Sequence, residues 1–329
     1  MKRTFLIFII FLGVQVLVFA QKKQKDAEFR SWEESLIKLR EQSMYAPTES
    51  ERFALNDEFM TLLETVINEP NSLSFQWDST KNFSIVTSPD KLVRFYTWCV
   101  WKDNRAVINF GFLQVYTPGR HKYVVYPLND SRQNIDYPDT HLGSFNSWFG
   151  AIYYDIIPLT VSLSSGKRTY YTLLGYNANN VFSKQKVIDV LYLKNNSTPV
   201  FGAKIFKDYP KGKVTRVIFE YNKNAELALT YGTNSYKERT DKRDPKTRKF
   251  IYQTIKDNMI MFEELIPMDE FMPPTPAFMV PESSLYQGFV EKDGKWVFIK
   301  DSVNLPPLER ELFIPKVSQK DFHTPNIQR

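Results

Sequence analysis

The sequence contains one cysteine, Cys99, and three histidines in 329 residues. A single cysteine cannot form an internal disulfide, which excludes a disulfide scaffold even in an oxidising compartment. The histidines are not spaced as a zinc-binding pair, and the HExxH motif of zinc hydrolases is missing. The glycine-rich loops that hold phosphate groups and the G-x-S-x-G turn of serine hydrolases are missing too. We therefore expect no metal site and no cofactor.

Two patterns that define common large folds are also missing. Predicted strands and helices do not alternate as βαβ units, so a doubly wound parallel sheet is excluded. The turn signals share no period of about 40 to 50 residues, so a β-propeller-like fold is kept only as an alternative. The chain is long enough for a large apolar core, and it needs no covalent staple for stability.

Residues 1–20 have the layout of a secretory signal peptide and resemble bacterial export signals in general. Two basic residues precede an apolar run over 4–18, and Val18 and Ala20 fit the small-residue cleavage pattern. Cleavage after Ala20 would leave a periplasmic or secreted protein without a transmembrane span. The alternative is an uncleaved membrane anchor, for which the apolar run is short.

Positive charge is concentrated in one segment. Without residues 1–20 the chain carries 41 basic and 37 acidic residues, and segment 237–249 carries seven basic and three acidic ones, so both have a net charge of +4. The rest of the chain is balanced, which argues against a nucleic-acid partner. We expect the segment, which contains Pro245, to be a solvated loop. Contact with an anionic polymer is the alternative.

Residues 21–70 are predicted to form an N-terminal helical segment that packs on the body. Apolar residues recur at helical spacing in two stretches, namely Phe29, Trp32, Leu36 and Leu39, and then Leu55, Phe59, Leu62, Leu63 and Val66. Thr48 and Glu51 precede the second stretch with the spacing of a capping box. Because both stripes are amphipathic, each helix should pack on another surface.

Residues 71–263 form the main β-rich domain in this prediction, because the apolar period changes to two. Strands are expected from residue 72 and at 105–117, 121–127, 148–157 and 168–176. Ser88 to Lys91 is predicted to be a turn, and the runs 216–221 and 226–231 are predicted to pair as a hairpin. The predicted fold class is α+β, mainly antiparallel β as a sandwich-like or strongly curved sheet, with an N-terminal helical pair.

Residues 264–301 are predicted to be a proline-rich crossover followed by a closing hairpin. The stretch 264–281 contains five prolines, which disfavour both a regular helix and a central strand. Asp293 and Gly294 suit a type I′ turn between two strands within 288–299. Residues 302–329 are expected to form an extended C-terminal tail.

The stretch RFYTWCVW, residues 94 to 101, is predicted to be a strand with two different faces. Cys99 lies on the more apolar face, where it should behave as a small hydrophobic residue with a raised pKa. The other face carries Arg94, Tyr96 and Trp98. These three residues are expected to pack beneath a second layer, and the alternative is that they stack against a sugar ring or another planar ligand.

Four residues are weak candidates for catalysis. Asp136, Asp139 and His141 fall within six residues of each other, where they could hold a divalent metal ion or where the histidine, beside carboxylates, could act as a general base. The same composition is ordinary for a turn, which is the favoured interpretation. Asp155 lies in a strand that is apolar on both faces, so its carboxylate needs either a hydrogen-bonding partner or a shifted pKa. A hydrogen-bonded structural role is favoured for it over a catalytic one.

Further candidate ligand-binding residues follow the strand that is expected to end at Gly175. Tyr176, Asn177 and Asn179 offer an aromatic ring and amide groups of the kind found in polar ligand sites. A tight turn explains the same residues and is the favoured interpretation.

Two functions remain open at this stage. The first is an exported bacterial envelope protein that acts as a non-catalytic binding or scaffold module for a glycan, a peptidoglycan fragment or another envelope protein. The second is a secreted hydrolase of glycosidase type, in which an Asp/Glu pair meets only in the folded chain and therefore leaves no sequence motif. The missing catalytic motifs favour the first.

Overall fold

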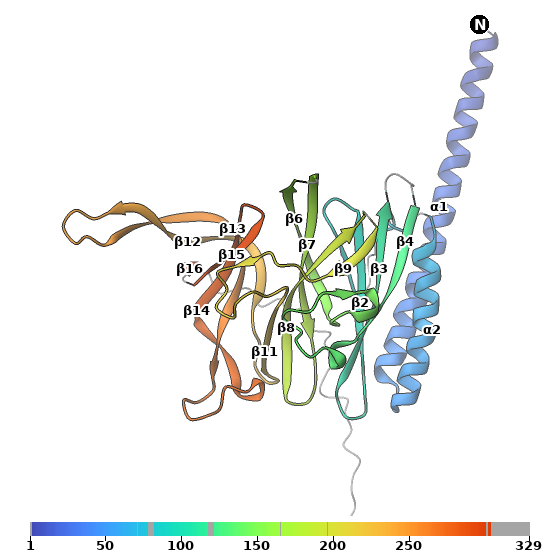
Figure 1. The fold of residues 1–329 in the computed structure, drawn as a ribbon. Coiled ribbons are helices and arrows are strands. Elements are labelled where there is room, and N and C mark those ends of the chain that lie inside the picture. The colour runs from blue at the N-terminus through green and yellow to red at the C-terminus, as the bar shows by residue number, and fades with distance from the viewer. Residues whose placement is uncertain are drawn as a thin grey trace, which may run out of the picture.

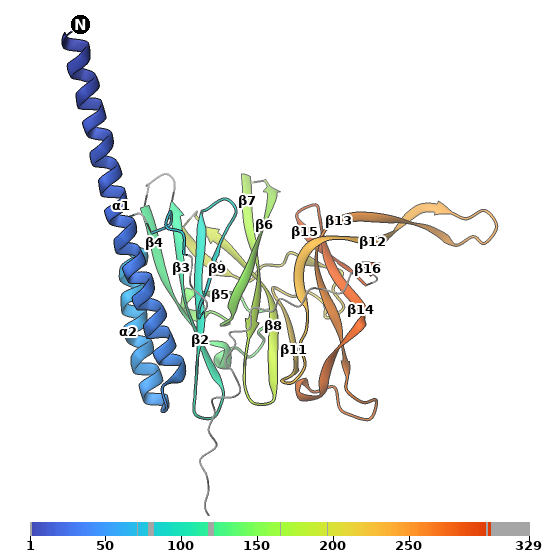
Figure 2. The same cartoon turned by 180° about the vertical axis from the view of Figure 1, so that it is seen from behind.

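The computed structural model describes residues 2–70, 72–77, 82–117, 122–164, 166–195, 197–300 and 302–303. Within these residues the chain forms two N-terminal helices and three sheets whose strands pair almost entirely antiparallel. Figure 1 shows four layers side by side, with the helices at one end, then the first, second and third sheets. Figure 2 shows the same order from behind. The predicted α+β class with an N-terminal helical pair is therefore confirmed.

The helical layer consists of α1 (Lys2–Tyr45) and α2 (Glu49–Asn68). The predicted apolar stripes face inward: Phe29 and Leu36 of α1 and Phe59 and Leu63 of α2 are buried. They pack against one face of the first sheet in a cluster that includes Trp98. Most of the stability of these helices should come from this contact, because amphipathic helices are weak in isolation.

Helix α1 runs without a break through Ala20, the residue after which cleavage is predicted. Its N-terminal part extends beyond the other layers in Figure 1. None of the described helices combines the length and apolar character expected of a membrane-spanning helix.

The N-terminus of α2 has the predicted capping box. The Glu51 amide donates to Thr48 Oγ1 at 3.2 Å, and the Thr48 amide donates to Glu51 Oε2 at 3.3 Å. We expect Thr48→Ala to lower the free energy of unfolding by about 1 kcal/mol, because one helix amide loses its acceptor. Urea unfolding would measure this, with Thr61→Ala as a control in the exposed middle of the same helix. An equal loss in both variants would contradict the capping role.

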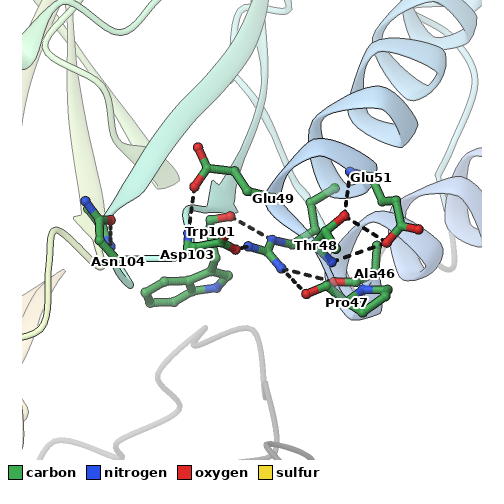
Figure 3. A network of polar contacts seen from close by, with 10 residues as sticks. Ala46, Pro47, Thr48, Glu49, Glu51, Trp101, Asp103 and Asn104 are labelled. Atoms are coloured by element: carbon green, nitrogen blue, oxygen red, sulfur yellow. Dashed lines mark hydrogen bonds and ion pairs between the residues drawn. The ribbon is translucent and has the colours of Figure 1, made fainter.

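Arg52 of α2 ties the helices to the first sheet. Figure 3 shows the polar network at this junction, which includes Trp101 and Asp103. The Arg52 guanidinium donates to the Trp101 carbonyl at 2.8 Å and to Asp103 Oδ1 at 2.5 Å. It also donates to the Ala46 carbonyl at 3.1 Å, while Glu49 accepts the Asp103 amide at 2.7 Å. The connection between the helices is thereby held against the connection that follows β2.

The first sheet has the strand order β1-β2-β3-β4 and is antiparallel throughout. Its strands are β1 (Ser84–Thr87), β2 (Val93–Trp101), β3 (Val107–Thr117) and β4 (Lys122–Asn129). The predicted turn precedes β2, where the Lys91 amide donates to the Ser88 carbonyl at 2.8 Å. Tyr96 and Trp98 face the helices, whereas Phe95 packs against the second sheet.

The second sheet has the order β5-β9-β8-β7-β6, and β11 also pairs with β8. Its strands are β5 (Gly143–Ser144), β6 (Ile152–Leu163), β7 (Gly166–Asn177), β8 (Ser183–Lys194), β9 (Thr198–Phe201) and β11 (Val217–Asn222). Both faces are covered in its central part. Leu173 packs toward the first sheet, and Leu174 packs toward the third.

The third sheet has the order β10-β15-β14-β13-β12-β16, and only the β10–β15 pair is parallel. Its strands are β10 (Phe206–Lys207), β12 (Leu229–Arg243), β13 (Phe250–Pro267), β14 (Met279–Lys292), β15 (Lys295–Ile299) and β16 (Ser302–Val303). The predicted hairpin joins β14 to β15, with φ values of 52° at Asp293 and 72° at Gly294, and is confirmed.

One predicted pairing and one predicted strand are wrong. The runs 216–221 and 226–231 do not form a hairpin, because β11 pairs with β8 while β12 pairs with β13. The chain instead crosses from the second sheet to the third after Asn222. No strand begins at residue 72, since the carbonyls of Ser72 and Leu73 accept hydrogen bonds from the Arg94 guanidinium at 3.1 and 2.9 Å.

Two segments predicted to be irregular contain strand. β13 extends to Pro267, where it pairs with Met279 of β14, so the crossover interpretation is wrong for the start of 264–281. Pro267 is the last residue of β13, and Pro281 lies where β14 pairs with β13 but not with β15, so both prolines are tolerated. The basic segment is a loop only at its tip, because β12 continues to Arg243 before the turn that contains Pro245. Of the predicted tail, only 302–303 lie among the described residues.

Candidate functional site

A pocket of about 680 Å³ lies where the second sheet meets the β13–β14 hairpin of the third. Its polar lining includes Arg132, Asp139, Asn179, Gln185, Lys211 and Glu220. Its apolar lining includes Phe149, Ile218, Leu265, Pro274, Pro276 and Met279. The lining is thus about half polar and half apolar, which suits a ligand that carries both kinds of group.

Arg132 enters the pocket from the short helix η2 (Arg132–Asn134). Its Nη2 donates to the Val107 carbonyl at 2.9 Å and lies 3.7 Å from Asp130 Oδ2. Nη1 has no partner in the described structure, although the side chain is only 9% exposed. Burial lowers the pKa of Arg132, and the Asp130 carboxylate partly offsets this effect. A buried guanidinium N–H without an acceptor is well suited to bind one from a ligand.

Asp130 fixes the start of this helix. Its Oδ1 accepts the Arg132 amide at 3.2 Å, and its Oδ2 accepts the Asn109 amide at 2.9 Å. The carboxylate lies so close to Gly150 that a Cβ atom there would overlap it, and Gly150 has a φ of +77°. Glycine is therefore required at this position, both for the space and for the backbone conformation.

The opposite wall is built around Glu220 of β11. Glu220 Oε1 accepts from Asn179 Nδ2 at 3.0 Å and from Ser183 Oγ at 2.6 Å, and Oε2 accepts from Gln185 Nε2 at 3.0 Å. Gln185 is 7% exposed, and its Oε1 has no partner in the described structure. Two residues of the lining, Arg132 and Gln185, thus each have a buried polar atom without a partner in the described structure.

Asp139 and Lys211 add one charge of each sign to the lining. Burial raises the pKa of Asp139, while the positive charges of Lys211 and Arg216 oppose the rise. Asp139 also uses its backbone, because its carbonyl accepts the Thr215 amide at 2.7 Å.

A buried ion pair holds the loop that carries Asp139. Arg216 Nε donates to Asp189 Oδ1 at 3.0 Å, and both side chains are fully buried. Arg216 Nη1 donates to the Pro138 carbonyl at 2.8 Å, which fixes the loop against β11. Tyr153 donates its hydroxyl proton to Asp189 Oδ2 at 2.9 Å, and Trp148 Nε1 donates to the Tyr153 oxygen at 2.8 Å.

Two of the predicted site residues line the pocket, whereas the residues predicted beside them do not. Asp139 and Asn179 come from segments predicted separately and line the same pocket. Asp136 is exposed, and neither it nor His141 belongs to the lining. The His141 carbonyl instead accepts from Thr215 Oγ1 at 3.0 Å, and burial lowers the pKa of its imidazole.

Tyr176 and Asn177 lie behind the pocket rather than in it. Asn177 is fully buried, where its Nδ2 donates to the Gly150 carbonyl at 3.0 Å and its Oδ1 accepts the Asn179 amide at 2.8 Å. Tyr176 is 6% exposed and lies beside the Lys186 ammonium, 5.4 Å from its ring centroid. Asn177 therefore positions the pocket residue Asn179, and neither candidate belongs to the lining.

Asp155 lies outside the pocket as well. The register of β6 against β7 shifts between Tyr153 and Asp155, and this bulge leaves the carboxylate half-buried. Its Oδ1 accepts the Ile156 amide at 2.8 Å, and burial raises its pKa. A bulge disrupts the ladder locally and can re-aim a side chain, which explains how this otherwise apolar strand accommodates a carboxylate.

The aromatic face of β2 is closed to ligands. Tyr96 and Trp98 are fully buried beneath the helices, and Arg94 is 8% exposed. Their polar atoms are paired inside the protein: Tyr96 donates to Gln114 at 3.1 Å, and Trp98 donates to Asn56 at 2.7 Å. The stacking alternative for this face is therefore wrong in this structure.

Cys99 lies on the opposite face of β2, and burial raises its pKa. The Arg40 charge opposes this shift only in part. The thiol thus has the character predicted for it, that of a small buried hydrophobic residue.

Most pocket residues escaped prediction, among them Glu220, Arg132 and Gln185. Glu220 is an acidic residue inside the mostly apolar run RVIFEY, and this contrast could have marked it as a candidate from the sequence. Arg132 lies in the same loop as the predicted Asp139, and Gln185 is unremarkable in sequence. The pocket draws on segments that are far apart in the chain, so only the fold shows that these residues meet.

Within the described residues, no group of three or more His, Cys, Asp or Glu side chains is arranged to hold a metal ion. No protein-family model matches this chain, and neither a curated protein nor a solved structure matches it. The chemistry of the pocket is therefore the basis for any functional proposal.

Proposed function

We propose that this chain is an exported envelope protein that binds a peptide-like ligand in its pocket without converting it. The observation that carries the proposal is that two residues of one lining each have a buried polar atom without a partner, namely Arg132 Nη1 and Gln185 Oε1. A peptide supplies what both need, namely a carboxylate or carbonyl for the guanidinium and an amide N–H for the Gln185 oxygen. Peptide-bearing fragments of peptidoglycan have this chemistry.

The apolar part of the lining favours a peptide over a bare glycan. Sugar rings bind well against exposed aromatic faces, yet no tryptophan is exposed and Phe149, the aromatic residue of the lining, is 2% exposed. Leu265, Ile218 and Met279 instead offer a surface for an aliphatic side chain.

The β13–β14 connection extends this apolar surface beyond the pocket. Its residues Met268, Phe271 and Met272 are exposed, and Phe271 has 88% of its surface accessible. Pro274 and Pro276 of the same connection line the pocket. Exposed apolar groups at the rim of a site are typical of a surface that contacts a polypeptide.

We expect Arg132→Met to weaken binding of muramyl peptides by about ten- to a hundredfold, because a hydrogen bond to a charged group contributes about 1.5–3 kcal/mol. Isothermal titration calorimetry with wild type and variant measures this. Arg105→Met, at an exposed arginine outside the lining, is the matched control and should bind as wild type does. Equal affinity of wild type and Arg132→Met, or equally tight binding of glycan chains that lack peptide, contradicts the proposal.

A glycosidase-type hydrolase is the second candidate, because two carboxylates, Asp139 and Glu220, line the same pocket. Burial raises the pKa of Asp139, as a general acid requires. The hydrolase ranks second because both Glu220 oxygens already accept hydrogen bonds from Asn179, Ser183 and Gln185. Release of reducing ends from peptidoglycan by wild type but not by Asp139→Asn would favour the hydrolase.

A further inference from the structure

β12 and β13 continue as a two-stranded arm beyond the rest of the third sheet. β14 pairs with β13 only from Met259 onward, and β16 pairs with β12 at Ser235 and Tyr236. Between Lys237 and Lys256 the two strands pair only with each other among the described residues. Figures 1 and 2 both show this ribbon extending away from the body. The arm shares no residue with the pocket lining.

The arm has one strongly basic face. Cross-strand partners lie on the same face of a ribbon, and the register pairs Arg239 with Tyr252 and Arg243 with Phe250. Alternation along each strand adds Lys237 and Lys256 to this face. The basic face therefore consists of Lys237, Arg239, Arg243, Phe250, Tyr252 and Lys256. Ring contacts support this placement, since the Arg239 and Arg243 guanidinium carbons lie 4.3 and 4.1 Å from the Phe250 centroid.

The acidic residues of the arm do not neutralise this face. Residues 237–256 contain eight basic and three acidic side chains, a net charge of +5. Glu238 alternates to the opposite face, where it forms an ion pair with Lys292. The Asp244 carboxylate caps the turn at the tip by accepting the Thr247 amide at 2.6 Å. Asp241 lies in the irregular stretch where the register shifts.

The positive charges of the basic face are spread along its length. From Phe250, which pairs with Arg243, to Lys256 the regular strand β13 advances about 20 Å at its usual rise per residue. No compact anion can contact groups so far apart, whereas an extended anionic surface can contact all of them. Each basic group near an anionic bilayer adds about fivefold to binding.

The aromatic residues favour a lipid surface over a nucleic acid. Single-stranded nucleic acids bind by stacking bases on open rings, but the Phe250 ring is occupied by two guanidinium groups. Tyr252 is 58% exposed, and a tyrosine at the edge of a basic surface suits the boundary between headgroups and acyl chains. We propose that the basic face of the arm binds the headgroups of an anionic lipid bilayer.

The test is co-sedimentation of the full chain with phosphatidylcholine vesicles, with and without phosphatidylglycerol. We expect binding only to the anionic vesicles and a steep decrease with added salt. Joint replacement of Lys237, Arg239, Arg243 and Lys256 by glutamine should weaken it by more than about a hundredfold. The matched control replaces four exposed lysines of the body by glutamine, namely Lys167, Lys194, Lys204 and Lys207, and should bind nearly as wild type does. Equal losses in both variants would overturn the proposal.

A second pair of variants tests which face is used. Tyr252→Ser should weaken vesicle binding severalfold, whereas Ile251→Ser, at an exposed residue of the opposite face, should leave it unchanged. Circular dichroism of each variant confirms that the fold is retained. Equal effects of the two substitutions, or tighter binding to single-stranded DNA than to anionic vesicles, would overturn the assignment.

Discussion

Replacing Arg216 by methionine is expected to lower the free energy of unfolding by about 3–5 kcal/mol, the usual cost of breaking a buried ion pair. The substitution leaves the Asp189 carboxylate fully buried with only the Tyr153 hydroxyl and the Val190 amide as hydrogen-bond donors. A carboxylate without its cation in such a site is costly because it has lost its hydration. Urea unfolding followed by tryptophan fluorescence measures the effect.

The double variant Asp189→Leu with Arg216→Met separates the lost pair from the unpaired charge. Removing both charges should restore much of the stability, since apolar residues often replace a buried pair at little cost. Arg105→Met, at an exposed arginine, should change stability little. A double variant as unstable as Arg216→Met would show that the loop contacts of Arg216, and not the Asp189 charge, carry the effect.

Replacing Lys186 by methionine is expected to stabilise the protein at neutral pH by about 3 kcal/mol. Lys186 is 4% exposed, and burial lowers its pKa to about 8. The Tyr154 and Tyr176 rings, 4.6 and 5.4 Å from the ammonium, offset only part of the lost hydration. Methionine keeps the length of the side chain and removes the charge.

The sign of the pH dependence follows from the lowered pKa. Below pH 8 both the folded and the unfolded chain hold the Lys186 proton, so wild type carries the full penalty of a buried charge. Between pH 8 and 10.5 the unfolded chain binds more protons than the folded chain, so the stability contributed by this group rises with pH. The advantage of the methionine variant should therefore shrink over this range and vanish above it.

Urea unfolding of wild type and Lys186→Met at several pH values from 7 to 10.5 tests this expectation. The buried tyrosines titrate in both proteins, so their contribution cancels when the two free energies of unfolding are subtracted. Lys194→Met, at an exposed lysine of the same strand, should show no such dependence. A stability difference that stays constant with pH would mean that Lys186 is not buried as a charge.

Local sequence chemistry predicted local structure well. Thr48 and Glu51 form their capping box, and Asp293 and Gly294 form their turn, because each depends on residues within four positions. The expected hairpin after Asn222 failed although its turn signal is real, since turn chemistry does not decide which strand becomes the partner. Partner choice depends on burial across layers.

The candidate site was predictable only in fragments. Asp139 and Asn179 stood out because polar residues cluster around them. Glu220 lies in a run predicted only as a hairpin strand, and Gln185 lies in β8, where the sequence analysis predicted no strand. The basic arm was taken for a loop because a ribbon that is exposed on both faces has no apolar alternation from which to recognise a strand.

The stacking of layers in chain order has a consequence for biosynthesis. The face of the second sheet that packs against the third is complete once β11 ends at Asn222. The residues Ile260, Phe289 and Trp296, which cover this face, are synthesised later. A growing chain therefore presents Leu174, Ile188 and its neighbours to water until the last strands arrive. Newly made molecules interrupted in that interval should aggregate or recruit a chaperone.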